Sequence, residues 1–190
     1  KTGIEKNLLT RRDAIRLMIE DTVNHIVNDV AVTGAIPRIA QDVAFIDKLE
    51  PGEGEFLVRT FHEICNRYGI ILSGGEISEQ PDIFANRGHI SPSLVVIGDL
   101  DPNEHIEGPR DIRIGDKIVV ISSNGPHTNG YTLIRDILMS QSPHLCDQIL
   151  VDGRNVLEAA LTPHQCYFAL IRKIIASPIK LHGLAHITGG

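Results

Sequence analysis

The chain has 190 residues, of which 42% are hydrophobic and 22% are charged, an ordinary balance for a globular protein with a sizeable core. Its net charge of −6, without a basic stripe, argues against a nucleic-acid partner. No apolar run approaches the roughly 20 residues of a membrane helix, and no secretory signal is recognisable. The cysteines Cys65, Cys146 and Cys166 form no CxxC pair and are expected to be reduced thiols. We therefore expect a cytoplasmic protein without membrane partners.

The residues before position 101 predict helices packed on one face of a sheet. An apolar stripe at helical spacing predicts a helix over 21–33, which Gly34 ends. A second helix is expected to end at Gly69. The order of helices and strands indicates an α+β fold. Strands are predicted over 36–46, 70–72 and 93–100.

A polar segment over 101–111 contains two prolines and predicts a domain boundary. We expect one domain over 1–104 and another over 112–190. The elements predicted in the second domain are a buried strand over 117–121, a helix over 131–138, a helix starting at Thr162-Pro163 and a strand over 180–185.

The loop over 122–130 joins the strand predicted over 117–121 to the next helix and has the composition of an anion-binding site. Unpaired backbone amides and the helix dipole favour an anion at a helix start. Gly125 lets a phosphate approach the backbone, Asn129 adds a donor, and His127 can hold or move a proton. The same composition suits an ordinary strand-to-helix turn, so composition alone leaves both interpretations open.

Two further polar groups lie, like the loop over 122–130, close to the end of a predicted helix or strand. Asn28 and Asp29 are poor helix formers near the end of the first helix, where either a solvated face or a polar site must accommodate them. Glu76 follows the glycine pair Gly74-Gly75. Carboxylates are oxygen ligands that suit Mg²⁺, although each acidic residue here, taken alone, is more often a solvated carboxylate than a metal ligand.

His127 and His186 are the histidines that lie in glycine-flanked polar strings. Taken alone, each is more often a hydrogen-bonded structural histidine than a catalytic one. The others show no i,i+4 pairing and no HExxH spacing, so they are assigned no chemistry. They are His25, His62, His89, His105, His144, His164 and His182.

The order of these motifs closely resembles that of the aminoimidazole ribonucleotide synthetase family, also called phosphoribosylformylglycinamidine cyclo-ligases. Two strings are specific to that family and separate it from related kinases and synthetases. They are Gly125-Pro126-His127-Thr128-Asn129-Gly130-Tyr131 and Ala185-His186-Ile187-Thr188-Gly189-Gly190. The rest of the series, in family order, is Asn28-Asp29, Gly74-Gly75-Glu76 and Leu161-Thr162-Pro163.

The resemblance implies a two-domain α+β fold with helices on mixed or antiparallel sheets, an incomplete C-terminal domain, and a homodimer built through the N-terminal domains. It also implies ATP and Mg²⁺ as cofactors, and ATP-dependent closure of formylglycinamidine ribonucleotide to aminoimidazole ribonucleotide in purine biosynthesis. By this match Asp29 and Glu76 bind the metal, and His127 and His186 lie close to the reacting groups. The residues implied at ATP or phosphate are Lys6, Asn28, Gly74, Gly75, Ser123, Gly125 and Asn129.

Two departures from the family pattern leave the activity open. The family opens this region with Asp-Gly-Val-Gly-Thr-Lys, whereas residues 1–6 read Lys-Thr-Gly-Ile-Glu-Lys, so a metal-binding Asp is replaced. The chain also stops at Gly190, where the family continues. The hypotheses are an active cyclo-ligase, a truncated or degenerate relative that dimerises and binds nucleotide without turnover, and another ATP-using member of the superfamily.

Overall fold

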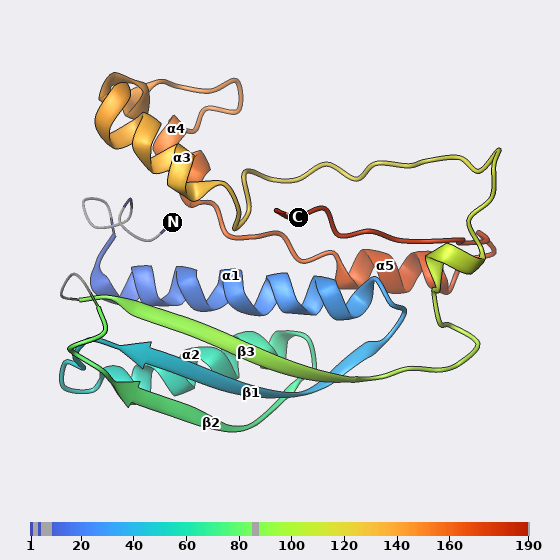
Figure 1. Cartoon of the computed structure of the whole chain (residues 1–190), viewed down its shortest axis with the longest axis horizontal. Coiled ribbons are helices and arrows are strands. Elements are labelled where there is room, and N and C mark those ends of the chain that lie inside the picture. Colours follow the sequence, from blue (N-terminus) through green and yellow to red (C-terminus); the bar gives the residue numbers. More distant parts are fainter. Residues whose placement is uncertain (2–3, 5–8, 85–87, 190) are drawn as a thin grey trace.

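The computed structural model describes residues 1, 4, 9–84 and 88–189 and has the expected α+β architecture. Helices α1 (Arg11–Ala31) and α2 (Glu53–Arg67) cover one face of a sheet formed by three of the described strands (Figure 1). Strand β1 (Ile36–Ile46) is central: β2 (Ile71–Glu79) runs parallel to it and β3 (Ile90–Asp99) antiparallel. The sheet is mixed, so the predicted fold class is confirmed.

Helix α1 is longer than the helix predicted over 21–33. It begins at Arg11 because the side chain of Thr10 caps it, accepting a hydrogen bond from the amide of Asp13. The apolar stripe continues toward the N-terminus through Ile15 and Ile19, which are buried. The helix therefore spans the whole length of the sheet, as Figure 1 shows.

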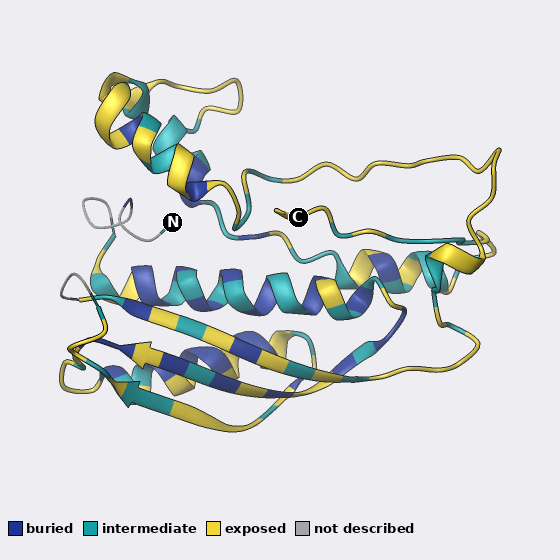
Figure 2. Ribbon diagram, in the orientation of Figure 1, coloured by how far each residue is buried: buried dark blue, intermediate teal, exposed yellow. Residues whose placement is uncertain are grey.

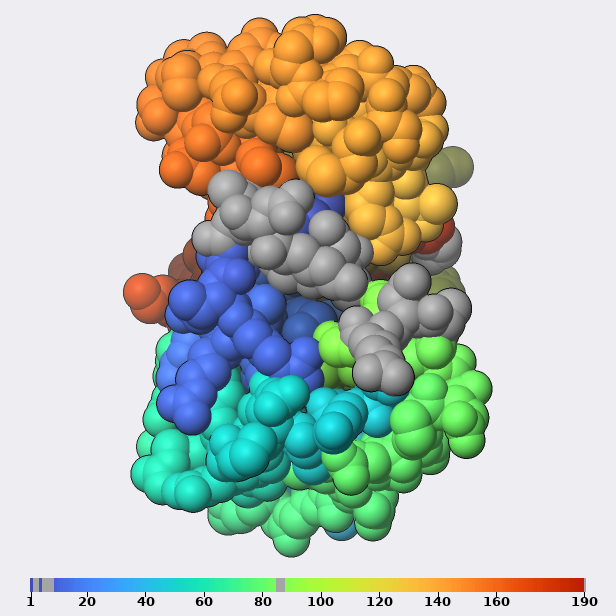
Figure 3. Space-filling view, turned by 90° about the vertical axis from the view of Figure 1, so that its left-hand side faces the viewer, coloured from blue at the N-terminus to red at the C-terminus, as the bar shows by residue number. Residues whose placement is uncertain are grey.

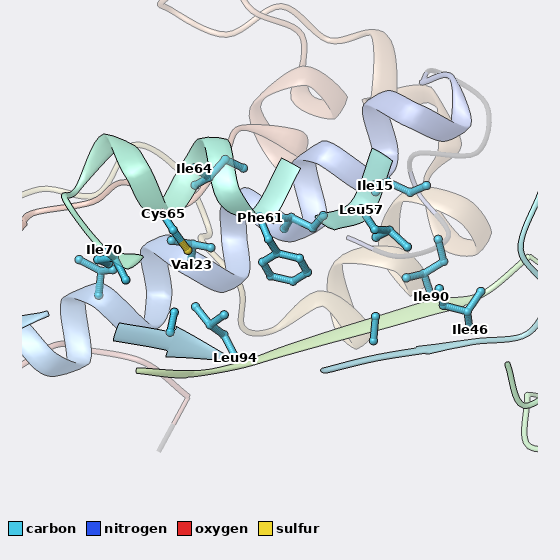
Figure 4. Close-up of a cluster of buried hydrophobic side chains, with 14 residues drawn as sticks. Ile15, Val23, Ile46, Leu57, Phe61, Ile64, Cys65, Ile70, Ile90 and Leu94 are labelled. Atoms are coloured by element: carbon cyan, nitrogen blue, oxygen red, sulfur yellow. The ribbon is translucent and has the colours of Figure 1, made fainter. Parts of the chain in front are cut away.

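The core lies between the two helices and the sheet (Figure 4). Leu57, Phe61 and Ile64 of α2 are fully buried and share one helix face. Ile46 and Leu94 meet them from the sheet. All three cysteines of the chain are free thiols, and one of them lies in this core.

Gly74, Gly75 and Glu76 lie inside strand β2, and the prediction that they follow a strand over 70–72 is wrong. Gly74 has a φ of +144°, and the pairing register with β1 shifts next to it, which marks a β-bulge. At Gly75 an added Cβ would lie 2.3 Å from the carbonyl oxygen of Asp42 and 2.3 Å from its Oδ1. Backbone geometry and close packing thus explain both glycines locally.

The strand predicted over 117–121 is wrong, and so is the strand predicted over 180–185. Both segments run without a strand partner among the described residues, and Figure 2 shows the first as an exposed line across the molecule. Ile118, for example, is 91% exposed. A β-branched run becomes a strand only where a neighbouring strand takes its backbone hydrogen bonds.

Residues 131–161 form a helical lobe at one end of the molecule, the orange part above the sheet layer in Figure 3. Helix α3 starts at Tyr131, as predicted, but the α-helical hydrogen bonding ends at Asp136. The rest of the lobe comprises a π-helical turn (Ile137–Gln141), a 3₁₀ turn (Pro143–Asp147) and helix α4 (Val156–Leu161).

The helix predicted to start at Thr162-Pro163 is α5 (Phe168–Ile175), which starts only at Phe168. Asn155 forms a capping box with Glu158 and starts α4 earlier in the chain, so Thr162 caps the C-terminus of α4. Helix α5 lies beside the C-terminal end of α1 (Figure 1). A 3₁₀ turn (Gly108–Arg110) precedes the lobe. None of the helices in the described part of the chain is long and apolar enough to cross a membrane.

Candidate functional site

Four histidine rings gather on the side of α1 that faces away from the sheet. His25 comes from α1, His127 from the loop over 122–130, His164 from the segment between α4 and α5, and His186 from the C-terminal segment. The rings of His127 and His164 stack with centroids 4.0 Å apart. The His164 centroid lies 5.2 Å from those of both His25 and His186. Segments far apart in the sequence therefore meet at one polar cluster.

His164 is buried at the centre of the cluster. Its amide donates to Asp21 Oδ1 at 2.7 Å, and its carbonyl oxygen accepts from Asn24 Nδ2 at 2.6 Å. Its Nδ1 lies 3.3 Å from Thr128 Oγ1. The pKa of His164 is lowered to about 3, mainly by burial and next by the neighbouring His127. The ring is therefore a neutral imidazole at physiological pH.

Asn28 fixes the segment that carries His164. Its Nδ2 donates to the carbonyl oxygen of Gln165 at 2.8 Å and lies 3.2 Å from His164 Nε2. Its Oδ1 accepts from the amide of Tyr167 at 2.7 Å. The buried Asn28 side chain thus sits in a polar site, and its contacts to the chain use both of its polar atoms.

Asp29 is exposed beside the cluster and contacts two of its rings. Its Oδ1 accepts a hydrogen bond from His186 Nδ1 at 2.7 Å, and its Oδ2 lies 3.3 Å from His25 Nε2. The contact to His186 joins the motif at the end of α1 to the motif at the C-terminal end of the chain. Two of the residues predicted for the site are therefore brought together here.

The loop over 122–130 is tied to the same place. His127 Nε2 donates to Asn124 Oδ1 at 3.0 Å, and Asn124 Nδ2 donates to the carbonyl oxygen of Pro163 at 2.9 Å. His127 has a φ of +57°, a left-handed conformation that is uncommon outside glycine. Burial, followed by the nearby His186, lowers the pKa of His127. The loop conformation thus presents the ring to the cluster.

The other residues of this loop that were predicted for the site lie outside the histidine cluster. Ser123 and Asn129 are exposed, and Gly125 packs against α4, where an added Cβ would lie 3.1 Å from the carbonyl oxygen of Ala159. A Cβ on Gly189 would lie 2.7 Å from Asn129 Oδ1, so the C-terminal segment runs close along the loop. The exposed donors of Ser123 and Asn129 are accessible to a ligand.

Glu76, Gly74 and Gly75 are not part of this cluster. Glu76 pairs with Val43 and is exposed on the face of the sheet opposite the helices, whereas Asp29 lies beyond α1 on the other side. One metal ion cannot be held by both carboxylates within a single chain of this geometry. Lys6, the remaining predicted phosphate contact, lies outside the described residues.

Sequence reasoning missed His25 and His164. A signal for His25 was present, because it precedes Asp29 by four residues and therefore shares its helix face. His164 carries no such signal, since its partners Asn28 and Thr128 lie 136 and 36 residues away in the sequence. Only the fold brings these groups together.

The comparisons with known proteins agree with this architecture. The family model described as AIR synthase related protein, N-terminal domain, matches residues 18–100, and the corresponding C-terminal domain model matches residues 113–190. The chain belongs to this family of AIR synthase related proteins. A phosphoribosylformylglycinamidine cyclo-ligase of Synechococcus sp. (strain CC9902) is 31% identical over 100% of this chain and 58% of its own length. The chain spans about half the length of the curated relatives it matches.

Two solved structures share the fold. The thiamine-monophosphate kinase from Stenotrophomonas maltophilia K279a is 19% identical, has a TM-score of 0.60, and is matched over 85% of this chain and 47% of its own. A complex described as AaThiL with AMPPCP and TMP is 20% identical, has a TM-score of 0.55, and is matched over 86% of this chain and 47% of its own. At these identities the likeness concerns the fold alone.

Proposed function

We propose that this chain carries the site of an ATP-dependent cyclo-ligase, which closes formylglycinamidine ribonucleotide to aminoimidazole ribonucleotide in purine biosynthesis. The observation that carries the proposal is the meeting of Asp29, the His127 loop and His186 on one side of α1. These are the strings that resemble the cyclo-ligase family, and the curated relatives carry that name.

In this proposal the reaction is a phosphoryl transfer to the formyl oxygen, followed by attack of the amidine nitrogen and loss of phosphate. Positioning and neutralisation of charge supply most of the catalysis in such reactions. Ser123 and Asn129 offer exposed donors to a phosphate, and Gly125 between them is partly exposed. His127 and His186 lie beside them and hold or move the proton of the reacting groups.

Mg²⁺ would enter with ATP and neutralise the phosphate oxygens. Asp29 is the carboxylate of this chain that fits the role, because it is exposed at the edge of the histidine cluster. Glu76 is displayed on the outer face of the sheet, so it would contribute to a nucleotide site only where a second chain covers that face. The proposed contacts at Lys6, Asn28, Gly74 and Gly75 remain predictions.

We also propose a homodimer through the outer face of the sheet in the region 1–104, with the region 112–190 forming the substrate part. This face carries large apolar side chains with 40–67% exposure, an arrangement typical of an interaction surface. They are Ile39, Phe45, Ile71, Val95 and Ile97. Cytoplasmic localisation is part of the same proposal, since purine precursors and ATP are available there.

Binding is tested by thermal unfolding with Mg²⁺–ATP, with the ribonucleotide, and with both. The proposal predicts a higher Tm with each ligand, and loss of the Mg²⁺–ATP shift in Asp29→Asn. Asp99→Asn is the matched control, because Asp99 is an exposed, ion-paired carboxylate at the end of β3. If neither ligand raises the Tm of the wild-type chain, the binding claim is wrong.

A second candidate is a relative that binds nucleotide without turnover. It is favoured by the replaced metal-binding Asp in residues 1–6. Ligand-dependent stabilisation without release of ADP would support it.

A further inference from the structure

Three imidazoles of the cluster, those of His127, His164 and His186, offer nitrogen atoms that lie within 4.8 Å of one another. Three imidazoles are a common donor set for zinc and neighbouring divalent ions. We propose that His127, His164 and His186 bind a late first-row divalent cation such as Zn²⁺. The inference concerns the binding of the metal alone and does not rest on the proposed ligase function; in a chain that holds the cation, His127 and His186 serve as ligands and do not move protons.

The hydrogen bonds of the three rings leave one nitrogen of each available. His186 donates from Nδ1 to Asp29 Oδ1 at 2.7 Å, which leaves its Nε2. His127 donates from Nε2 to Asn124 Oδ1, which leaves its Nδ1; the direction follows because the Asn124 amide nitrogen already donates to a carbonyl oxygen. His164 Nδ1 faces Thr128 Oγ1, so its Nε2 is the nitrogen turned toward His186, with Asn28 Nδ2 at 3.2 Å on the same atom.

Two of these available nitrogens face each other at a spacing that suits a metal. His164 Nε2 and His186 Nε2 are 3.2 Å apart. In a tetrahedral zinc site with Zn–N bonds of about 2.0–2.1 Å, two ligand nitrogens are separated by roughly 3.3–3.4 Å. When both rings carry their proton on Nδ1, two lone pairs meet here, and a cation between them removes that repulsion. Little movement of these two rings is needed, whereas His127, whose ring stacks on that of His164 with centroids 4.0 Å apart, must turn to point its nitrogen at the same cation.

The surroundings of the rings resemble the support of a histidine metal site. Asp29 holds Nδ1 of His186 and so fixes both the tautomer and the orientation of that ring, as carboxylates do behind metal-binding histidines. His164 is buried and held through its backbone by Asp21 and Asn24. Asn28 Nδ2, 3.2 Å from His164 Nε2, keeps its shorter bond to the carbonyl oxygen of Gln165 when the cation takes that position.

The donor type determines which cation fits. Three nitrogen ligands suit Zn²⁺, Co²⁺ and Ni²⁺, whereas Mg²⁺ requires oxygen ligands. His25, Asp29 and His186 form a second group within the same 4.8 Å limit, but it shares His186 with the first group and offers only two imidazoles. The first group therefore holds the cation, and Asp29 orients the ring of His186 through its hydrogen bond with Nδ1.

Co²⁺ is the probe, added to the untagged chain, because a four-coordinate Co²⁺ site has strong visible absorption and an octahedral one does not. We expect one Co²⁺ per chain with tetrahedral absorption, displaced by one equivalent of Zn²⁺ and unaffected by excess Mg²⁺. His127→Gln and His164→Gln should each weaken Co²⁺ binding by at least about 100-fold. Asp29→Asn should weaken it by about 10–100-fold, the usual effect of removing a supporting carboxylate.

His62→Gln on α2 is the matched control, since His62 is exposed and outside the cluster, and it should bind Co²⁺ as the wild type does. Thermal unfolding without metal identifies any variant that fails to fold; His127 is only half-buried, so its variant remains informative if the His164 variant does not fold. The proposal is overturned if the wild type shows no saturable tetrahedral absorption. Retention of that absorption in a folded His127→Gln variant at wild-type affinity would overturn it equally.

Discussion

Replacing Gly75 by alanine tests whether packing requires this glycine. The added Cβ would lie 2.3 Å from both the carbonyl oxygen and Oδ1 of Asp42, more than 1 Å closer than ordinary contact at about 3.4 Å or beyond. The Asp42 side chain can rotate, but its carbonyl oxygen belongs to the central strand β1 and cannot move without disturbing the sheet. Strand β2 must therefore shift.

Overpacking of this kind costs about 1–3 kcal/mol, and loss of ladder hydrogen bonds adds to it. We expect Gly75→Ala to lower the free energy of unfolding by about 2–3 kcal/mol. For a chain of this length that corresponds to a fall in Tm of roughly 5–10 °C. Urea unfolding followed by circular dichroism, in the absence of any ligand, measures the change.

Gly54→Ala is the matched control, because Gly54 lies inside α2 and its added Cβ would be 3.9 Å from the nearest atom, Leu49 Cδ1. It should be neutral or stabilise the chain by up to about 1 kcal/mol. The double variant Asp42→Ala/Gly75→Ala should recover only part of the loss, since the backbone contact remains. A Gly75→Ala variant as stable as the wild type would refute the packing argument.

Three further predictions concern buried polar groups. The pKa of His164 is lowered to about 3 in the folded chain, so below about pH 6.5 the unfolded chain binds a proton that the folded chain does not. The free energy of unfolding should therefore fall by up to about 1.4 kcal/mol per pH unit toward pH 3. Urea unfolding at several pH values should show a smaller fall in His164→Gln. Burial raises the pKa of Asp42, so this residue contributes to the stability of the fold at low pH, and that contribution is lost as pH rises through the folded pKa. The free energy of unfolding of the wild type, relative to that of Asp42→Asn, should therefore fall between pH 4 and pH 7. Asn28→Ala removes a buried side chain and leaves the part-buried amide of Tyr167 without its acceptor, so it should cost about 2–3 kcal/mol. Asn66→Ala, at an exposed position of α2, should change the free energy of unfolding by less than about 0.5 kcal/mol.

Much of the N-terminal half could be predicted because its signals are local. The apolar spacing of α2 and the β-branched run of β3 each determine an element within a short window, and the glycine after α2 takes a φ of +69°. The start of α1 was missed because the apolar stripe over 21–33 gives no weight to the Thr10 cap. Local patterns therefore give the elements more reliably than their ends.

The C-terminal half was harder because its elements depend on distant partners. The run over 117–121 has the composition of a buried strand, yet no described strand pairs with it. The candidate site was predicted in part, since Asp29, His127 and His186 do meet. His164 could not be placed, because its role depends on contacts with α1 and the loop that no local pattern encodes.

Release of ADP on mixing the chain with ATP, Mg²⁺ and formylglycinamidine ribonucleotide tests the central claim most directly. The proposal predicts ADP release that depends on the ribonucleotide, and its loss in His127→Gln but not in His62→Gln. ADP release that is the same with and without the ribonucleotide, or that persists unchanged in His127→Gln, would contradict the assignment of this site to the cyclo-ligase reaction.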